Sequence, residues 1–205
     1  GNILNPIEII NKYGIDELRY YLMKEVSHGS DGSISLKNLE NCINSDLANN
    51  YGNLCQRIFS FVKNNCDGEV KITQNYTKDD KKLLNFFKNT LDKLREMIDQ
   101  QDLNNYLKSV IELSFVTNKY INDTEPWKLK KKDPERMNTV LSISLDQIAK
   151  ITILLNPIIP KASDKVLKAM NISDKFKNLS FIKENKIFNN NIKINDLDIL
   201  FKKFE

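Results

Sequence analysis

Asn53 and Arg57 are the two residues whose types and spacing most clearly suggest chemistry. They lie four positions apart in a stretch expected to be helical, so both side chains project from one face, about 6 Å apart along the axis. An amide and a guanidinium together offer several directional donors and one acceptor, which matches the edge of an unpaired nucleic-acid base. Asp46 and Asn49 extend this polar strip, whose other interpretation is an ordinary solvated helix face.

Trp127 is the only tryptophan, and its surroundings are basic. It follows Glu125-Pro126, where the proline disfavours the α region for the residue before it, and it precedes Lys128, Lys130, Lys131 and Lys132. A tryptophan usually belongs to the core. In a basic segment without helical periodicity, however, a large flat ring suits a stacked nucleotide, an interaction worth about 1–3 kcal/mol per base. The lysines would attract phosphates in a salt-sensitive way without reading the base sequence.

The sequence contains no set of residues suited to catalysis or metal binding. The single histidine, His28, lies in the glycine-rich stretch 27–32, which we expect to be a turn. This stretch is not a phosphate-binding loop, because no Lys-Ser or Lys-Thr pair follows its second glycine. The three cysteines lack CxxC spacing, which argues against a disulfide framework or a zinc site and suits a reducing cytoplasm: Cys42, Cys55 and Cys66. We therefore predict no catalytic residue, no metal ligand and no cofactor in this chain.

The composition indicates a globular, mostly helical protein. Its 205 residues correspond to one large domain or two small ones, and a hydrophobic share of 40% is enough for a core. Six glycines and five prolines are too few for an architecture of many β-turns. No apolar run approaches 18 residues and the N-terminus does not resemble a secretory signal, so we expect a cytoplasmic protein without membrane contact. The net charge of +4 permits a polyanionic partner without requiring one.

A series of amphipathic helices must position the candidate residues. Apolar residues recur every three or four positions, and capping residues mark the expected helix starts: Ser35, Thr77, Asp102 and Asp133. Thr77 and Asp80 resemble a capping box with aspartate in place of glutamate. The pattern predicts an all-α helical bundle behind a small N-terminal helical unit, with helices over residues 6–13, 16–26, 36–64, 78–98, 103–121, 134–155 and 162–170. The tail beyond is expected to be irregular, with short strands.

Several motifs follow one another in a characteristic order. They are Gly1-Asn2, Asn5-Pro6, the stretch 12–22 (KYGIDELRYYL), Gly29-Ser30-Asp31-Gly32, the stretch 46–54 (DLANNYGNL) with Arg57, Glu125-Pro126-Trp127, the stretch 155–160 (LNPIIP) and Leu200-Phe201. This order, which covers nearly the whole chain, is similar to the C-terminal part of methionyl-tRNA synthetases, a family of class I aminoacyl-tRNA synthetases.

The resemblance implies a division of the chain into three parts. Residues 1–35 would be the remainder of the stem-contact region, 36–175 the anticodon-binding helical bundle, and 176–205 a tail that packs back toward the catalytic domain. In the family, Gly-Asn follows the lysine-serine loop that contacts ATP, so the catalytic domain would lie upstream and this chain alone would be inactive. The implied partners are methionine tRNA, through its anticodon stem-loop, and the protein's own catalytic domain, which would use ATP with magnesium. We expect a monomer.

The resemblance also assigns roles to the candidate residues. Asn53 and Arg57 match residues that hydrogen-bond the first base of the CAU anticodon, and Trp127 matches the tryptophan that stacks in the unwound loop. An arginine can donate to O2 and N3 of cytosine, whereas uracil presents an N–H at position 3. A phosphate role for Lys128, Lys130, Lys131 and Lys132 is not a family requirement. Two alternatives remain: the anticodon-binding bundle of another class I enzyme, such as the cysteine, isoleucine, valine or leucine enzyme, or a helical protein-interaction module.

Overall fold

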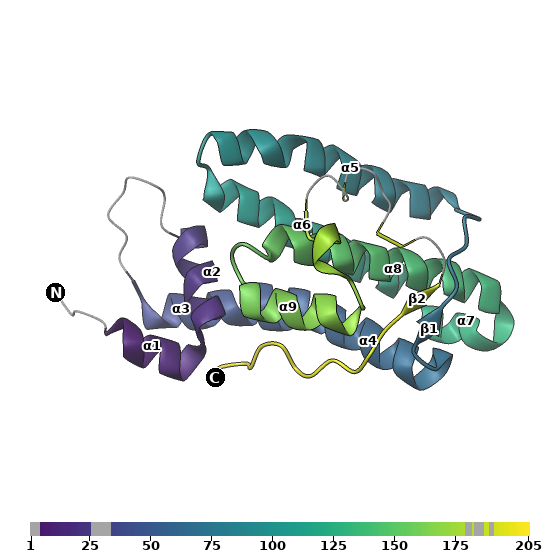
Figure 1. Cartoon of the computed structure of the whole chain (residues 1–205), viewed down its shortest axis with the longest axis horizontal. Helices are drawn as coiled ribbons and strands as arrows, with labels where there is room; N and C mark the ends of the chain where they lie inside the picture. Colours follow the sequence, from purple (N-terminus) through teal and green to yellow (C-terminus); the bar gives the residue numbers. More distant parts are fainter. Residues whose placement is uncertain (1–4, 26–33, 179–181, 183–186, 189–190) are drawn as a thin grey trace.

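The computed structural model describes residues 5–25, 34–178, 182, 187–188 and 191–205, and these form an all-α bundle with one small strand pair. The predicted fold class is confirmed. Long helices lie side by side, with the N-terminal helices at one end of the molecule and a short helix at the other (Figure 1). The elements are α1 (Pro6–Tyr13), α2 (Ile15–Glu25), α3 (Leu36–Cys42), the π-helix η1 (Ile43–Gly52), α4 (Asn53–Cys66), β1 (Glu69–Val70), α5 (Lys78–Asp99), α6 (Leu103–Thr124), α7 (Pro126–Lys132), α8 (Pro134–Leu155), α9 (Pro160–Ala169), the 3₁₀ helix η2 (Asp174–Phe176) and β2 (Ile192–Lys193).

The helices begin where the capping residues predict. Ser35 accepts a hydrogen bond from the amide of Asn38, Asp102 from that of Asn105, and Asp133 from that of Arg136. Thr77 and Asp80 form both hydrogen bonds of a capping box. These side chains satisfy amide groups that the first turn of a helix leaves without a partner. The predicted glycine-rich turn at 27–32, with His28 and the Gly29–Gly32 motif, lies outside the described residues, as does Gly1-Asn2.

The predicted helix over residues 36–64 is helical throughout but is not one regular α-helix. Its middle, η1, is a π-helix between α3 and α4. Gly52 ends this segment, and a Cβ atom there would lie 2.8 Å from the carbonyl oxygen of Leu47 and 3.2 Å from the Phe201 ring. Apolar residues recurring at three or four positions cannot distinguish these two kinds of helix, which explains why the sequence did not reveal the change.

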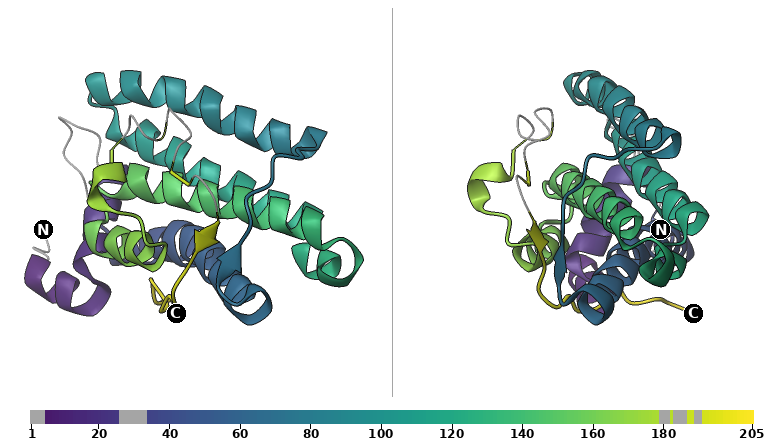
Figure 2. Two further views of the ribbon diagram at one scale, coloured as in Figure 1. Left: turned by 45° about the vertical axis from the view of Figure 1, so that its right-hand side comes forward. Right: turned by 90° about the vertical axis from the view of Figure 1, so that its right-hand side faces the viewer.

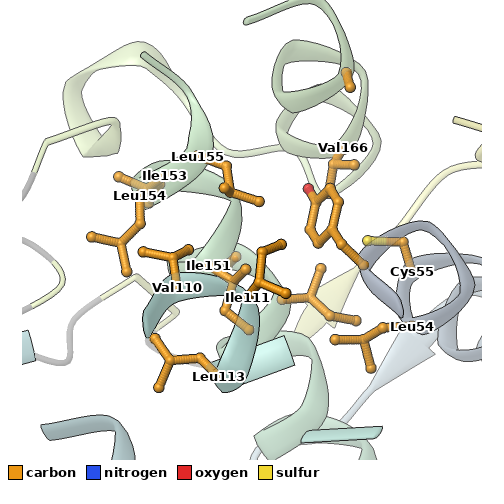
Figure 3. Close-up of a cluster of buried hydrophobic side chains, with 14 of the residues drawn as sticks. Leu54, Cys55, Val110, Ile111, Leu113, Ile151, Ile153, Leu154, Leu155 and Val166 are labelled. Atoms are coloured by element: carbon orange, nitrogen blue, oxygen red, sulfur yellow. The ribbon is translucent and has the colours of Figure 1, made fainter. Parts of the chain in front are cut away.

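The core is centred on α8, which lies between α6 and α9 (Figure 2). Every residue from Thr139 to Leu155 except Asp146 is buried. By length and composition α8 could cross a membrane, but 89% of its apolar window is buried inside the protein. Figure 3 shows apolar side chains of four helices meeting here, from α4 (Leu54, Cys55), α6 (Val110, Ile111, Leu113), α8 (Ile151, Ile153, Leu154, Leu155) and α9 (Val166).

The C-terminal tail packs along the bundle as an irregular strand. β2 pairs with β1 in antiparallel register, Val70 opposite Ile192. Further on, Phe201 is buried beside Tyr51 of η1, with ring centroids 6.3 Å apart. Phe204 then packs edge-on against Tyr13 of α1. Of the short strands expected in the tail, the described residues contain one, β2, and the closing Leu-Phe segment packs against the helix that leads into Asn53.

Candidate nucleic-acid interface

Asn53 and Arg57 lie on the first two turns of α4 and face α6. The guanidinium of Arg57 is half-buried and donates from Nη2 to Oδ1 of Asn122 (2.7 Å) and from Nη1 to Oδ1 of Asn118 (3.4 Å). Asn53 is exposed, and its side chain has no hydrogen-bond partner among the described residues. Arg57 is thus held in place by two neutral amides, while the amide of Asn53 faces solvent.

The two side chains line an open cleft of about 570 Å³ between η1–α4 and α6. Asp46 and Asn49 line it as well, so the predicted polar strip does form one face. The complete wall consists of Lys24, Ser45, Asp46, Asn49, Asn50, Asn53 and Arg57 on one side and Lys108, Ile111, Glu112, Phe115, Asn118 and Asn122 on the other. This wall is rich in amide donors and acceptors, which suits hydrogen bonding to base edges.

Trp127 lies on α7, the short helix at the end of the bundle near the start of α8. The sequence predicted no helix here, because the segment lacks an apolar repeat, but residues Pro126–Lys132 form one. Pro126 occupies its first turn, where a proline needs no hydrogen bond. Glu125 adopts the left-handed conformation (φ 45°, ψ 60°), which turns the chain sharply between α6 and α7. A non-glycine residue with positive φ is uncommon and costs free energy, so this corner is held by the packing around it.

The structure brings the indole of Trp127 next to Arg57. Trp127 is 43% exposed, and the guanidinium carbon of Arg57 lies 5.8 Å from the ring centroid, within the range of a cation–π contact. Trp127 does not itself line the cleft, so Arg57, 70 positions earlier in the chain, is the residue that joins it to Asn53 in one cluster. The cluster combines an open aromatic face with directional donors beside it.

The four lysines that follow Trp127 differ in their surroundings, although all are exposed. Lys128 forms an ion pair with Glu125 (2.8 Å), and Lys130 donates to Oδ1 of Asn65 (3.1 Å). Lys131 and Lys132 have no ion-pair partner among the described residues. The last two are thus the freest to contact a phosphate.

Sequence reasoning missed the residues on α6 that complete the cluster. Asn118 accepts from Arg57 and donates through Nδ2 to the backbone and side-chain oxygens of Asn50 (both 3.2 Å). Asn122 is the closer partner of Arg57. The available signal was the spacing of these two asparagines, four positions apart, which places both amides on one helical face just as in the Asn53–Arg57 pair.

The described residues contain no cluster of three or more His, Cys, Asp or Glu that could hold a metal ion. Burial raises the pKa of the Cys42 and Cys55 thiols to about 12, so both stay protonated and unreactive at neutral pH. Both cysteines are core residues, as predicted.

Comparison with known protein families agrees with the fold. Residues 70–205 match the family model described as the anticodon binding domain of methionyl tRNA ligase. Residues 1–59 match the model described as tRNA synthetases class I (M). The fold and both matches define the class as that of class I aminoacyl-tRNA synthetases.

Individual relatives give the same result. The methionine–tRNA ligase of Brucella suis biovar 1 is 38% identical over 167 residues, covering 82% of this chain and 32% of that protein. The Rickettsia conorii ligase is 35% identical over 209 residues, covering 100% of this chain and 41% of its own length. Mycobacterium tuberculosis methionyl-tRNA synthetase in complex with methionyl-adenylate superposes with a TM-score of 0.92 at 28% identity, covering 98% of this chain and 40% of that one. The chain belongs to the methionyl-tRNA ligase family, and it spans between a third and two fifths of the length of these relatives.

Proposed function

We propose that this chain is the tRNA-binding part of a methionine–tRNA ligase and that it recognises the CAU anticodon of methionine tRNA. The observation that carries the proposal is the position of Arg57, which lines an open cleft together with Asn53 and whose guanidinium carbon lies 5.8 Å from the centroid of the Trp127 ring. The longer protein would attach methionine to the tRNA in an ATP-dependent reaction with magnesium. ATP and magnesium would be bound elsewhere in that longer protein, because we assign no described residue of this chain to either of them.

The chemistry of the cluster fits the first anticodon base. A splayed cytosine stacked on the exposed face of Trp127 would point its edge toward Arg57 and Asn53. Arg57 would then exchange its hydrogen bonds to Asn118 and Asn122 for O2 and N3 of the base, and the free amide of Asn53 would add a further donor or acceptor. Uracil cannot accept at N3, so the same geometry disfavours it.

The basic residues around the cluster would attract the backbone of the loop. Lys131 and Lys132 are exposed and lie on the same short helix as Trp127. Their contribution falls with added salt and does not discriminate between anticodons, because phosphates carry no sequence information. The predicted division at residues 35 and 175, the monomeric state and the cytoplasmic location remain parts of this proposal.

A titration with anticodon hairpins tests the proposal through Trp127 itself. As the only tryptophan, it reports by fluorescence on any base that stacks on it. We expect a CAU hairpin to quench this emission and to bind more tightly than hairpins with UAU or with the anticodons of other class I enzymes. Trp127→Ala should lose about 1–3 kcal/mol of binding free energy, or roughly 5- to 150-fold in affinity, measured by anisotropy of a labelled hairpin.

The matched control is Trp127→Phe, which keeps a smaller stacking face and should bind between the wild type and the alanine variant. Because Trp127 is only 43% exposed, thermal unfolding of Trp127→Ala is measured alongside, and binding is compared at a temperature at which both proteins are folded. Equal binding of the wild type and Trp127→Ala would contradict the stacking role. No RNA binding at low salt would instead favour a protein-interaction module.

A further inference from the structure

Phe115 is an exposed aromatic side chain in the wall of the cleft, and the proposed function assigns it no role. It is 57% exposed, whereas the other aromatic side chains of α6, Tyr106 and Tyr120, are each 6% exposed. A single exposed apolar side chain on a protein surface needs no explanation. Phe115, however, lies in a wall that is otherwise mostly polar, beside the residues proposed to read a base.

The contacts between the two sides of the cleft fix the order of residues along it. Asn50 donates to the carbonyl oxygen of Ile111 (3.2 Å), and Arg57 donates to Asn122 (2.7 Å). The two walls therefore advance in the same direction, with residue numbers rising together. Phe115 falls between these two contacts.

In the direction of α6, Phe115 comes before the residues that hold Arg57, and Trp127 comes after them. Trp127 follows the end of α6 and contacts the guanidinium from there, outside the wall of the cleft. Phe115 precedes Asn122, the closer partner of Arg57, by seven residues, or about 10 Å along the helix axis. A base read by Arg57 and a base on Phe115 would be separated by about this distance along the cleft, which requires that the two nucleotides be splayed apart.

We infer that Phe115 is a second stacking platform, which holds the base next to the one that Asn53 and Arg57 read. In the CAU loop this is the adenine that follows the cytosine, so the inference rests on the proposed function. Every base has a π-face, and stacking is therefore tolerant of sequence. Phe115 should add affinity for any unpaired base at that position, while Arg57 keeps the discrimination.

Lys108 supports the same path for the nucleic acid. It lines the cleft seven residues before Phe115, two turns earlier on the same face of α6. It is exposed and has no ion-pair partner among the described residues. An RNA strand that passes from Trp127 to Phe115 would continue toward Lys108. The positive charge of Lys108 therefore suits a contact to a phosphate of that strand.

The test compares Phe115→Leu with wild type, because leucine keeps an apolar side chain but removes the π-face. We expect the affinity for the CAU hairpin to fall by about 5- to 150-fold, with the preference for CAU over UAU unchanged. Phe115→Trp keeps a π-face at this position and should bind the CAU hairpin as tightly as the wild type. Phe86→Leu is the matched control: Phe86 is 37% exposed on α5, away from the cleft, and its replacement should leave affinity at the wild-type value.

A hairpin with 2-aminopurine in place of the anticodon adenine reports on the stack directly. Its fluorescence should be quenched in complex with wild type and should recover in the saturated Phe115→Leu complex, in which Trp127 emission is still quenched. Equal quenching or equal affinity in Phe115→Leu overturns the inference while leaving the proposed function intact. A wild-type protein that neither binds nor prefers CAU refutes the proposed function itself, and with it the role of Phe115.

Discussion

The guanidinium of Arg57 is held in the free protein by partners that a base can replace. Asn118 and Asn122 are neutral acceptors, and the Trp127 ring adds a weak electrostatic contact. A carboxylate in their place would form a stronger, charge-assisted hydrogen bond that a neutral base could displace only at higher cost. The residue is thus oriented toward the cleft but not locked, which suits a reader that must exchange its partners on binding.

Arg57→Gln is expected to relax the preference for cytosine over uracil. Glutamine loses the charge and cannot direct two parallel donors at O2 and N3, and hydrogen bonds to a charged group are worth about 1.5–3 kcal/mol. The ratio of dissociation constants for UAU and CAU hairpins should therefore fall by about tenfold or more. Competition anisotropy with both hairpins measures this ratio.

Arg95→Gln provides the control for the loss of one positive charge. Arg95 is exposed on α5, and its one ion-pair partner among the described residues is Asp99, one turn away. Its replacement should weaken binding of both hairpins slightly and equally, without changing their ratio. An unchanged ratio in Arg57→Gln as well would exclude Arg57 as the reader of the first base.

Three helices are joined at the end of the bundle that carries Trp127. Asp80 of α5 is fully buried; it accepts from the hydroxyl of Tyr120 on α6 (2.7 Å) and from both terminal nitrogens of Arg136 on α8 (2.5 and 2.8 Å). α7 lies between α6 and α8 in the chain and packs on α8. This network therefore ties together the two helices, α6 and α8, between which the corner at Glu125 lies in the chain.

Asp80→Asn is expected to destabilise the protein at neutral pH by about 3 kcal/mol, because it leaves a largely buried guanidinium without its counter-charge. Burial alone would raise the pKa of Asp80, but hydrogen bonds from Arg136 and Tyr120 outweigh it and hold the pKa below its ordinary value of 3.8. The stabilisation is thus present above pH 4 and is lost as pH falls through the lowered value. Urea unfolding from pH 7 to pH 2 measures both effects.

Asp79→Asn is the matched control, because the neighbouring carboxylate is exposed and belongs to the same first turn of α5. It should change the unfolding free energy by no more than a few tenths of a kcal/mol. In Asp80→Asn the acid branch of the stability curve should be flatter than in wild type. If the two variants have the same free energy of unfolding at pH 7, the buried network does not stabilise this end of the bundle.

Local rules account for the part of this structure that the sequence predicted. Ser35, Thr77, Asp102 and Asp133 are helix caps whose hydrogen bonds reach only three residues along the chain, so the sequence contains all that is needed. The spacing of Asn53 and Arg57 on one face follows from helical geometry in the same way.

The remaining features depend on contacts between distant segments. Asp80 was predicted as part of a capping box, and that prediction is confirmed. Its pairing with Arg136, however, is a tertiary contact between residues 56 positions apart. The helical state of the segment around Trp127 depends on the turn at Glu125 and on packing against α8. Phe115 gave no signal, because an apolar residue outside a helical stripe has no recognisable pattern until the opposite wall of a cleft is known.

At the scale of the whole molecule, α2 connects the N-terminal helices to two parts of the bundle. Arg19 donates to the carbonyl oxygens of Pro157 and Ile158 in the turn after α8, and Asp16 accepts from the amide of Ala162 in the first turn of α9. These side chains act as caps for helices more than a hundred residues away. They make the turn between α8 and α9 depend on α2.

The second connection of α2 reaches the cleft itself. Asp46 of η1 accepts from the hydroxyl of Tyr20 (2.8 Å) and pairs with Lys24 (2.6 Å), and both Lys24 and Asp46 line the cleft. Burial of Tyr20, reinforced by Asp46, raises its pKa above 10.0. Burial opposes the charge on Lys24, but the Asp46 hydrogen bond outweighs it and raises the pKa above 10.5. This stabilisation is fully present below pH 10 and is lost as pH rises through the raised values.

Asp46→Asn is expected to loosen the N-terminal helices and the cleft together. It removes the closer of the two carboxylates beside the largely buried Lys24 and leaves only the more distant Glu25 (3.7 Å), which should cost about 3 kcal/mol of unfolding free energy at pH 7, a difference that should shrink above pH 10. Hydrogen exchange should quicken in both α2 and η1, and the CAU hairpin should bind more weakly. Glu40→Gln is the matched control: Glu40 joins Tyr13 and Lys12 in the same tyrosine–carboxylate–lysine pattern at a more exposed position, so its effect should be small. Exchange that quickens only in α2, with hairpin affinity unchanged, would show that the cleft does not depend on this connection.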